Sequence, residues 1–482
     1  FNRSNFIIMI SKQEYCVYFG VYIGFIIWSI YTLYSEGIAI SKRTGYGLGN
    51  GWSIIGGVKD EADDEWEFFK HFIKSKIFYL QAVPIAHAII GLAFILATFQ
   101  NITIFTIFCS VFSFYIISKY ESRTLVWVLV VTWVAVTSLI KLNPQIYNGF
   151  EQFYAAIFTL SWGFLRCSSY NFSKIANIER TKKESLYNFI NYCGYTLYFP
   201  NLTFGPLMVF DRYIVCIDED AQIPALKGRI KRTLKDLARI LIWATLKEFL
   251  LHFLYINYFK LYVWTVKEFS FWTLYSFGYL MGQTFHMFYV ITYGLSNSIA
   301  RFEGMNPPLN PKCLSRMAFS FRMWKNFDQG MYEYMVKYIY FPLCGNNFST
   351  YRKTLATVLT FVFVYAWHGM FTFVLLWTIL NFACLYLERI FLYAIKTEAY
   401  TQFMDKHFSK SNQLRFYGLI GSQIFIPSAI SNFYFFGGVE IGNFYVENTY
   451  LSRGLWNYLG LTFCCYCIFQ CADLTWKVKK QK

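Results

Sequence analysis

His368 is a titratable side chain inside a stretch that is otherwise apolar, FVFVYAWHGMFTFVLLW at 361–377. A neutral imidazole accepts a proton near pH 7, because its reference pKa of about 6.5 lies close to that pH. Asp328 lies upstream, among aromatic residues. If folding brings the two together, the ring can take a proton from a nucleophile, while the carboxylate either orients the ring or holds a cationic acceptor. The pair therefore predicts acyl transfer and leaves the role of Asp328 open.

The neighbours of His368 separate it from the other histidines. The remaining five lie alone in apolar runs or beside lysines: His71, His87, His252, His286 and His407. A lone ring of that kind is ordinarily structural. His368 instead stands between Trp367 and Gly369, where one apolar run divides into two. A helix break there would let the ring reach a polar cavity without exposing backbone groups to lipid.

The composition places these residues in a membrane. The chain of 482 residues is 56% hydrophobic and 22% aromatic, with a mean hydropathy of +0.34, which excludes an ordinary soluble protein. We expect an all-α polytopic protein with about ten spans, forming a single domain over residues 1–482. The apolar runs lie near 15–34, 77–99, 102–117, 124–140, 153–165, 237–259, 271–295, 354–367, 371–387, 413–430 and 455–469.

Two further segments read as membrane-embedded but not as simple spans. The apolar stretch 186–210 contains Pro200, Gly205 and Pro206, which interrupt helical hydrogen bonding. It predicts either a re-entrant segment beside a water-accessible site or a kinked span. The long connection 301–352 is too aromatic for a solvated loop, so we expect an amphipathic or re-entrant segment that lines the core.

The charged residues do not indicate nucleic-acid binding, despite a net charge of +16, because they lie in short segments between the apolar runs. LKGRIKRTLK at 226–235 predicts a cytosolic loop or an interfacial amphipathic helix facing anionic membrane lipids. The acidic stretch DEADDEWE at 60–67 reads as a solvated face, or alternatively as the cap of an amphipathic helix. The 12 cysteines show no metal spacing and no disulfide framework.

The ends of the chain bear on its location. Met9 is a plausible start before the first apolar run, which is long enough to remain as a span and shows no cleavage pattern. The tail KKQK at 479–482 has the spacing of a dilysine retrieval signal, which predicts the endoplasmic reticulum membrane if the tail is cytosolic. The same basic tail also follows from the positive-inside rule.

Four separated blocks resemble one family. They are FPNLTFGP at 199–206, GMNPPLNPKCLSRMAFSFRMWKNFDQGMYEYM at 304–335, TFVFVYAWHG at 360–369 and SNFYFFGGVEIG at 431–442. In this order they resemble the membrane-bound O-acyltransferase (MBOAT) family, and within it the insect members of the branch that modifies Hedgehog-like proteins. The resemblance covers nearly the whole chain. It implies an MBOAT-like core of about ten transmembrane helices plus re-entrant segments around a membrane-embedded tunnel.

The resemblance also implies a reaction. The family's signature histidine falls on His368 and its partner position on Asp328, so both are expected to be catalytic. The implied activity is transfer of palmitate from palmitoyl-CoA to the N-terminal cysteine amine of a secreted signalling protein. His368 would act as the general base and then protonate the CoA thiolate, and Asp328 would position the acceptor. The alternatives are a non-catalytic relative that binds acyl-CoA or ligand, and an enzyme that acylates a lipid hydroxyl.

Further positions follow from the same resemblance. The expected acyl-CoA contacts are Trp324, Lys325, Asn381 and Asn432. The same residues could have purely structural roles instead: interfacial packing for Trp324, snorkelling for Lys325, and buried hydrogen bonding for Asn381 and Asn432. Cys313 matches a thiolate ligand of haem iron, implying haem b in a structural role, although a palmitoylated or inert thiol would look the same. Thr203 departs from the family, some of whose members carry a histidine there.

Overall fold

The structure, a computed structural model, describes residues 11–41, 47–66, 84–178, 187–216, 223–346, 348–452 and 454–481. The expected start at Met9 and the last residue of the dilysine tail lie outside these residues. The first half of the described chain contains α1 (Lys12–Ser41), α3 (Pro84–Thr98), α4 (Asn101–Ile117), α5 (Arg123–Leu142), α6 (Phe150–Ile178), α7 (Phe189–Thr196) and α8 (Phe210–Tyr213).

The second half is helical as well. It contains α9 (Leu226–Leu250), α10 (Ile256–Leu261), α11 (Val263–Val266), α12 (Phe271–Phe302), α13 (Ser320–Asn326), α14 (Gln329–Met335), α15 (Phe341–Cys344), α16 (Thr350–His368), α17 (Thr372–Ala394), α18 (Glu398–His407), α19 (Lys410–Tyr450) and α20 (Gly454–Gln481). The strands of the described chain, β1 (Leu48–Asn50) and β2 (Val58–Asp60), pair as one antiparallel hairpin. The predicted all-α fold is confirmed.

Five described helices are long and apolar enough to cross a membrane: α1, α5, α17, α19 and α20. The apolar helices α3 and α4 are shorter. Helix α12 combines length with burial, since most of its side chains are covered by the protein. The number of spans, expected to be about ten, stays a prediction.

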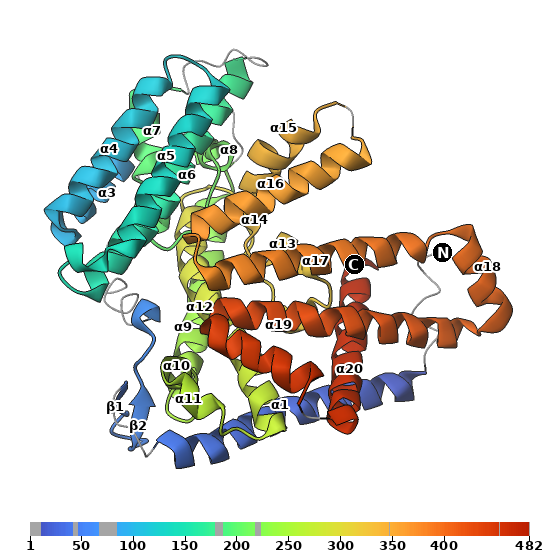
Figure 1. The fold of residues 1–482 in the computed structure, drawn as a ribbon. Coiled ribbons are helices and arrows are strands. Elements are labelled where there is room, and N and C mark those ends of the chain that lie inside the picture. The colour runs from blue at the N-terminus through green and yellow to red at the C-terminus, as the bar shows by residue number, and fades with distance from the viewer. Residues whose placement is uncertain are drawn as a thin grey trace.

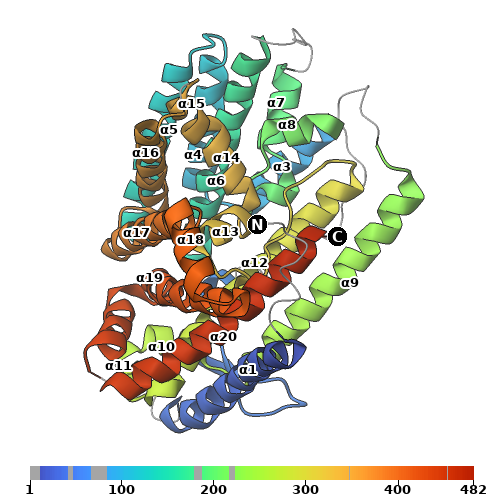
Figure 2. The same cartoon turned by 90° about the vertical axis from the view of Figure 1, so that its right-hand side faces the viewer.

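Helix α12 lies between two groups of helices (Figures 1 and 2). Helices α3 to α7 gather on one side, and α17, α19 and α20 lie on the other. Helix α16 contacts both α5 and α17 and so joins the two groups. Helix α12 packs along α9 and α1 and also contacts α19. The apolar side chains of α12 therefore belong to the core, and its polar side chains can line cavities inside the protein.

The segment that follows α7 is a buried, non-helical loop, as one of the two sequence interpretations predicted. The chain leaves α7, makes a short 3-10 turn at Phe199–Asn201 and runs on to α8, with every residue from 199 to 210 buried. The guanidinium of Arg166 on α6 is buried beneath it and donates to the carbonyl oxygens of Tyr198 (3.5 Å) and Leu202 (3.4 Å). Protein rather than lipid therefore satisfies this backbone.

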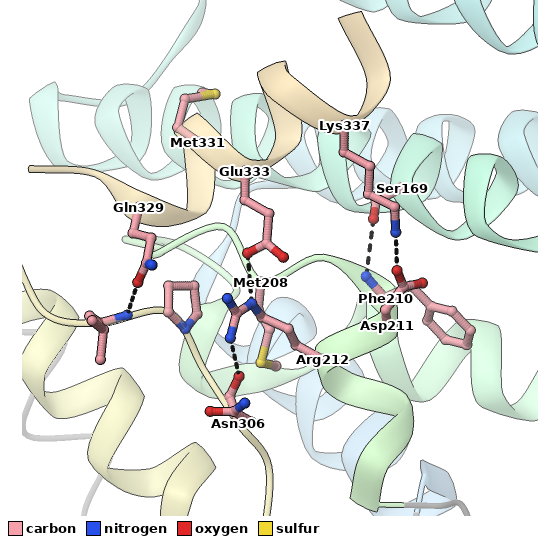
Figure 3. A network of polar contacts seen from close by, with 12 residues as sticks. Ser169, Met208, Phe210, Asp211, Arg212, Asn306, Gln329, Met331, Glu333 and Lys337 are labelled. Carbon is pink, nitrogen blue, oxygen red and sulfur yellow. Dashed lines mark hydrogen bonds and ion pairs between the residues drawn. The ribbon is translucent and has the colours of Figure 1, made fainter. Parts of the chain in front are cut away.

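Polar contacts hold α8, at the end of this loop, against α14 and the π-helical turn Val336–Tyr340 that follows α14 (Figure 3). The Arg212 Nε donates to the Glu333 carboxylate at 2.6 Å, and the Arg212 Nη1 donates to the Asn306 carbonyl oxygen at 3.0 Å. Lys337 pairs with Asp211, the residue before Arg212. The loop and the first turns of α14 are thereby joined through charged side chains at their rim.

Backbone contact between the loop and α14 is even closer. A Cβ atom added at Gly330 would lie 1.9 Å from the carbonyl oxygen of Leu207. Glycine is therefore the residue that fits at this crossing. Asp328 lies two positions before it, at the N-terminus of α14, so the crossing fixes where this carboxylate stands.

The apolar run around His368 does divide into two helices. Helix α16 ends at His368, and Gly369 follows in the left-handed region with φ 113°. Helix α17 begins at Thr372. The expected break is confirmed, and it places the imidazole at a helix end.

The basic stretch 226–235 forms the first turns of α9 rather than a loop. Its cytosolic-loop interpretation is therefore wrong, whereas a helical one is correct. The acidic stretch departs from expectation too. The Asp60 carboxylate is buried and accepts the backbone N–H of Asn257 (2.8 Å), and Asp63 pairs with the buried Lys247 at 2.8 Å. These two carboxylates are internal supports of the β1–β2 region, not a solvated face.

Candidate active site

A cavity of about 420 Å³ brings together Asp328 and His368, which sequence analysis had paired. Two further predicted residues, Trp324 and Asn432, also line it. Most of its wall is apolar and aromatic, with side chains from α6, α12, α13, α16, α17 and α19. A cavity with an apolar wall and a few converging polar groups is the usual form of a small-molecule site.

Asp328 is held in a fixed orientation. One carboxylate oxygen, Oδ1, accepts the backbone N–H of Met331 at 2.9 Å and so caps α14. The other, Oδ2, accepts the hydroxyl of Tyr293 on α12 at 2.8 Å. Burial raises the pKa of Asp328, and both donors oppose this effect by stabilising the charged carboxylate. In the described chain, no hydrogen bond joins Asp328 to the imidazole of His368.

His368 is positioned by ring packing. Its ring lies edge-on to Trp367, Trp377 and Phe435, with centroid separations of 4.8, 5.5 and 5.1 Å. Within the described residues its ring nitrogens have no protein hydrogen-bond partner. The imidazole can therefore exchange a proton with a bound molecule in the cavity, which is what a general base requires.

The four expected acyl-CoA contacts divide into two pairs. Trp324 lines the cavity beside Trp377, and the Asn432 Oδ1 accepts from the Trp377 indole at 3.2 Å. Asn381 is buried behind the wall and donates to the Ser431 hydroxyl at 3.1 Å. Lys325 is exposed on α13. The structure thus brings Trp324 and Asn432 to the cavity and leaves Asn381 and Lys325 outside its lining.

Cys313 does not form a recognisable haem site. It is half-buried, it is not among the residues that line the cavity, and its thiol lies 3.9 Å from the Gln283 carbonyl oxygen as a hydrogen-bond donor. Haem iron would take this sulfur as a thiolate. Across the described ranges, no group of three or more His, Cys, Asp or Glu side chains could hold a metal ion. The haem expectation is not supported.

A second cavity of about 520 Å³ adjoins the first. Asp63, Asn257 and Lys260 line it near the β1–β2 hairpin. Three ionisable side chains line both cavities: Glu65, Lys141 and His368. Four phenylalanines line both as well: Phe285, Phe288, Phe435 and Phe436. His368 therefore stands where the two cavities meet.

Sequence analysis missed Glu65, Lys141 and Tyr293 as site residues. Burial raises the pKa of Glu65, which lies outside the membrane-spanning helices, to about 7, and the charge of Asp63 adds to the effect. Lys141 follows an apolar run and looks like an ordinary interfacial lysine. Tyr293 is one of many tyrosines in the chain. Lys141 could have been noticed as a lysine at the end of an apolar run, and Glu65 as a member of the acidic stretch 60–67.

Comparisons with known proteins identify the family of the chain. The sequence model of the MBOAT, membrane-bound O-acyltransferase, family matches residues 109–431. Protein-cysteine N-palmitoyltransferase Rasp of Drosophila melanogaster is 36% identical over 97% of this chain and 96% of its own length. Protein-cysteine N-palmitoyltransferase HHAT of Mus musculus is 24% identical over 75% of this chain and 73% of its own. Membrane-bound O-acyltransferase GUP1 of Saccharomyces cerevisiae is 26% identical over 40% of this chain and 33% of its own.

Proposed function

The chain belongs to the membrane-bound O-acyltransferase family, and we propose that it is a protein-cysteine N-palmitoyltransferase of the endoplasmic reticulum membrane. The reaction is transfer of palmitate from palmitoyl-CoA to the N-terminal cysteine amine of a Hedgehog-like secreted protein. The relatives named as such enzymes support this activity, and one of them aligns with almost the whole chain. The observation that carries the proposal is that His368 and Asp328 line one cavity.

His368 is proposed as the general base. A terminal amine has a reference pKa of about 7.7–8.0 and is mostly protonated at neutral pH, so it must lose a proton before it attacks. That first proton leaves to water. An imidazole at the junction of both cavities can take the second proton, which the nitrogen loses as the amide bond forms, and deliver it to the CoA thiolate. The aromatic rings around His368 restrict its orientation and favour a single reactive geometry.

Asp328 is proposed to hold the acceptor rather than to orient the ring. Both of its oxygens are occupied by Tyr293 and by the backbone of α14, and no described contact reaches the imidazole. A carboxylate fixed in this way attracts the ammonium form of a terminal amine and brings its nitrogen to the cavity. This choice favours an amine acceptor over the hydroxyl of a lipid.

The donor is proposed to occupy the first cavity. Its aromatic wall suits a palmitoyl chain. The Asn432 Nδ2 donates one N–H to the Ser428 carbonyl at 2.7 Å, and its second N–H is proposed to donate to a thioester carbonyl. Trp324 would pack against the acyl chain. Lys325 and Asn381 keep more distant roles in the proposal, the first as an exposed cation for CoA phosphate and the second as a support for the α19 segment that carries Asn432.

The two substrates are proposed to enter from opposite sides. Helix α9 has 25 residues and is not among the five described helices that are long and apolar enough to cross a membrane. Its first half is basic, which favours the cytosolic side, and its other end contacts the β1–β2 hairpin, where Lys59 pairs with Glu248. The second cavity, lined by Asp63 and Glu65, would then open to the lumen and admit the protein acceptor.

A turnover assay tests the proposal. Purified protein is given palmitoyl-CoA and a peptide that starts with cysteine, beside the same peptide with an acetylated terminus. Amide-linked product is expected with the free terminus only, and it is expected to disappear in His368→Ala. Product on a lysolipid instead of the peptide would identify a lipid acyltransferase. Binding of palmitoyl-CoA without turnover would identify a non-catalytic relative.

A further inference from the structure

Lys141 is a cation at the junction of the two cavities that the reaction scheme above does not use. It lies in the last turn of α5, which packs against α16, and it lines both cavities together with His368. Its Nζ donates to the carbonyl oxygen of Trp367 at 2.9 Å, one residue before the imidazole. The side chain of Lys141 also fills the space beside Gly369, where an added Cβ would meet its Cδ at 2.9 Å.

The charge of Lys141 has no carboxylate partner among the described residues. Four other lysines and arginines with buried or half-buried heads do have one: Lys174 with Glu121, Lys247 with Asp63, Arg301 with Asp236 and Arg322 with Asp473. The buried Arg166 differs from Lys141, because it donates to two backbone carbonyls and lines neither cavity. An ammonium has three donors, and the Trp367 carbonyl takes one. A largely buried cation without a counter-charge is costly, which makes such a cation in the wall of a cavity a candidate functional residue.

We propose that Lys141 is a further catalytic residue that stabilises the negative charge formed during acyl transfer. The inference rests on the proposed function of His368. It concerns the donor half of the reaction, because it is the thioester of palmitoyl-CoA that becomes negative. Glu65 and His368 also line both cavities, Asp328 lines the first, and Asp63 and Lys260 line the second. Among the described residues, Lys141 is the lysine that lines both cavities.

The reaction places negative charge on two atoms in turn. The acceptor nitrogen forms a bond to the thioester carbonyl carbon, the π electrons move to oxygen, and His368 takes the amine proton. When the intermediate collapses, the oxygen returns its electrons, the carbon–sulfur bond breaks and the CoA sulfur leaves as a thiolate, which takes the proton from the imidazolium. An ammonium fixed beside His368 favours the oxyanion first and the thiolate next.

A purely structural role is the competing explanation. The bond from Lys141 to the Trp367 carbonyl satisfies a backbone acceptor near the C-terminus of α16, where a cation is generally favourable. Such a bond would position His368 without any contact to substrate. The two roles differ in what they need, because the structural one needs a donor and the catalytic one needs a charge.

Three substitutions at Lys141 separate the two roles in the full-length purified protein. Lys141→Gln keeps a donor but removes the charge, Lys141→Arg keeps both, and Lys141→Met keeps only the bulk of the stem. Lys174→Gln is the matched control, since the Lys174 Nζ also donates to a carbonyl at a helix end, that of Ser118 at 2.8 Å, and Lys174 lines neither cavity. Thermal unfolding in detergent checks that each variant is folded.

The expected result is a loss of kcat that follows the charge. Lys141→Gln and Lys141→Met should lower kcat by about 100-fold, with the KM for palmitoyl-CoA and for the cysteine peptide changed by less than about threefold. Lys141→Arg should retain most of the activity, and Lys174→Gln should match the wild type. If Lys141→Gln keeps its kcat within about twofold of the wild type, or if Arg fails as badly as Gln, the proposal is wrong.

Release of CoA without peptide distinguishes this proposal from the proposed function. Hydrolysis of palmitoyl-CoA passes through the same oxyanion with water as the nucleophile. A wild type that releases CoA but makes no amide would refute the cysteine acceptor, and the Lys141 variants would still be ranked by their release rates. A wild type with neither reaction would overturn both proposals.

Discussion

Gly330→Ala should disrupt the position of Asp328. The added Cβ would lie 1.9 Å from the Leu207 carbonyl oxygen, whereas contacts shorter than 3.0 Å are essentially never observed for this atom. The backbones of α14 and the buried loop must therefore separate by at least about 1.1 Å, since the obstacle is backbone and cannot rotate away. A shift of about 1 Å at a catalytic group can lower the rate by about 100-fold.

The same substitution is harmless elsewhere in the protein, which supplies the control. Gly163 lies within α6, and a Cβ added there meets no atom within 4 Å. Alanine in a helix interior is favoured over glycine by roughly 0.5–1 kcal/mol. Gly163→Ala should therefore leave the protein as stable as the wild type or slightly more stable, although both substitutions add one methyl group to a helix.

The assay measures kcat/KM for amide formation on a cysteine peptide, together with the midpoint of thermal unfolding in detergent. Gly330→Ala is expected to lose about 100-fold in kcat/KM and to unfold at a lower temperature, because overpacking costs about 1–3 kcal/mol. Wild-type kcat/KM and an unchanged midpoint would refute the reasoning. They would mean that α14 does not cross the loop at Leu207 as closely as described.

Three further predictions concern charges around the site. Asp328→Asn should preserve the cap of α14, because asparagine caps helices as well as aspartate does. It should nevertheless lower kcat/KM for the cysteine peptide by about 100-fold, because the negative charge is lost. Unchanged turnover would show that the charge is dispensable. The Glu65 carboxyl is neutral below its pKa of about 7 and charged above it, so the KM for a cysteine-start peptide should fall between pH 6 and 8, and Glu65→Gln should abolish that part of the pH dependence. A double-mutant cycle with Arg212→Gln and Glu333→Gln should give a coupling free energy of about 1 kcal/mol in the free energy of unfolding. Because both side chains are partly exposed to solvent, high salt should abolish this coupling, and a coupling that persists at high salt would contradict the prediction.

The parts of the site that were predictable are those with a local sequence signal. His368 stood out because Trp367 and Gly369 flank it at a division of an apolar run, and the structure ends a helix there. The loop at 199–210 was predictable because prolines and glycine interrupted an apolar segment. Asp328 stood out because a carboxylate among aromatic residues is costly in a membrane protein.

The remaining features depend on contacts between distant segments. Nothing near Tyr293 in the sequence indicates that its hydroxyl reaches Asp328, and nothing near Asp63 indicates that Lys247 approaches it. The acidic stretch therefore looked solvated when two of its carboxylates are internal. Asn381 was expected at the cavity. Its position in a helical sequence indicates on which face of the helix it lies, but not whether that face lines the cavity or packs against a neighbouring helix.

The meeting of the two cavities at His368 also bears on whether protons and ions could leak through the protein. A passage open from both sides of a bilayer would conduct protons and ions, and a membrane that stores calcium or keeps a redox gradient cannot tolerate such a leak. Phe285, Phe288, Phe435 and Phe436 surround the junction and offer no hydrogen bonds to a hydrated ion. A constriction of this kind opposes conduction by dewetting. The aromatic rings around the imidazole would thus act as an insulating seal, and chemistry across the membrane could proceed without electrical continuity.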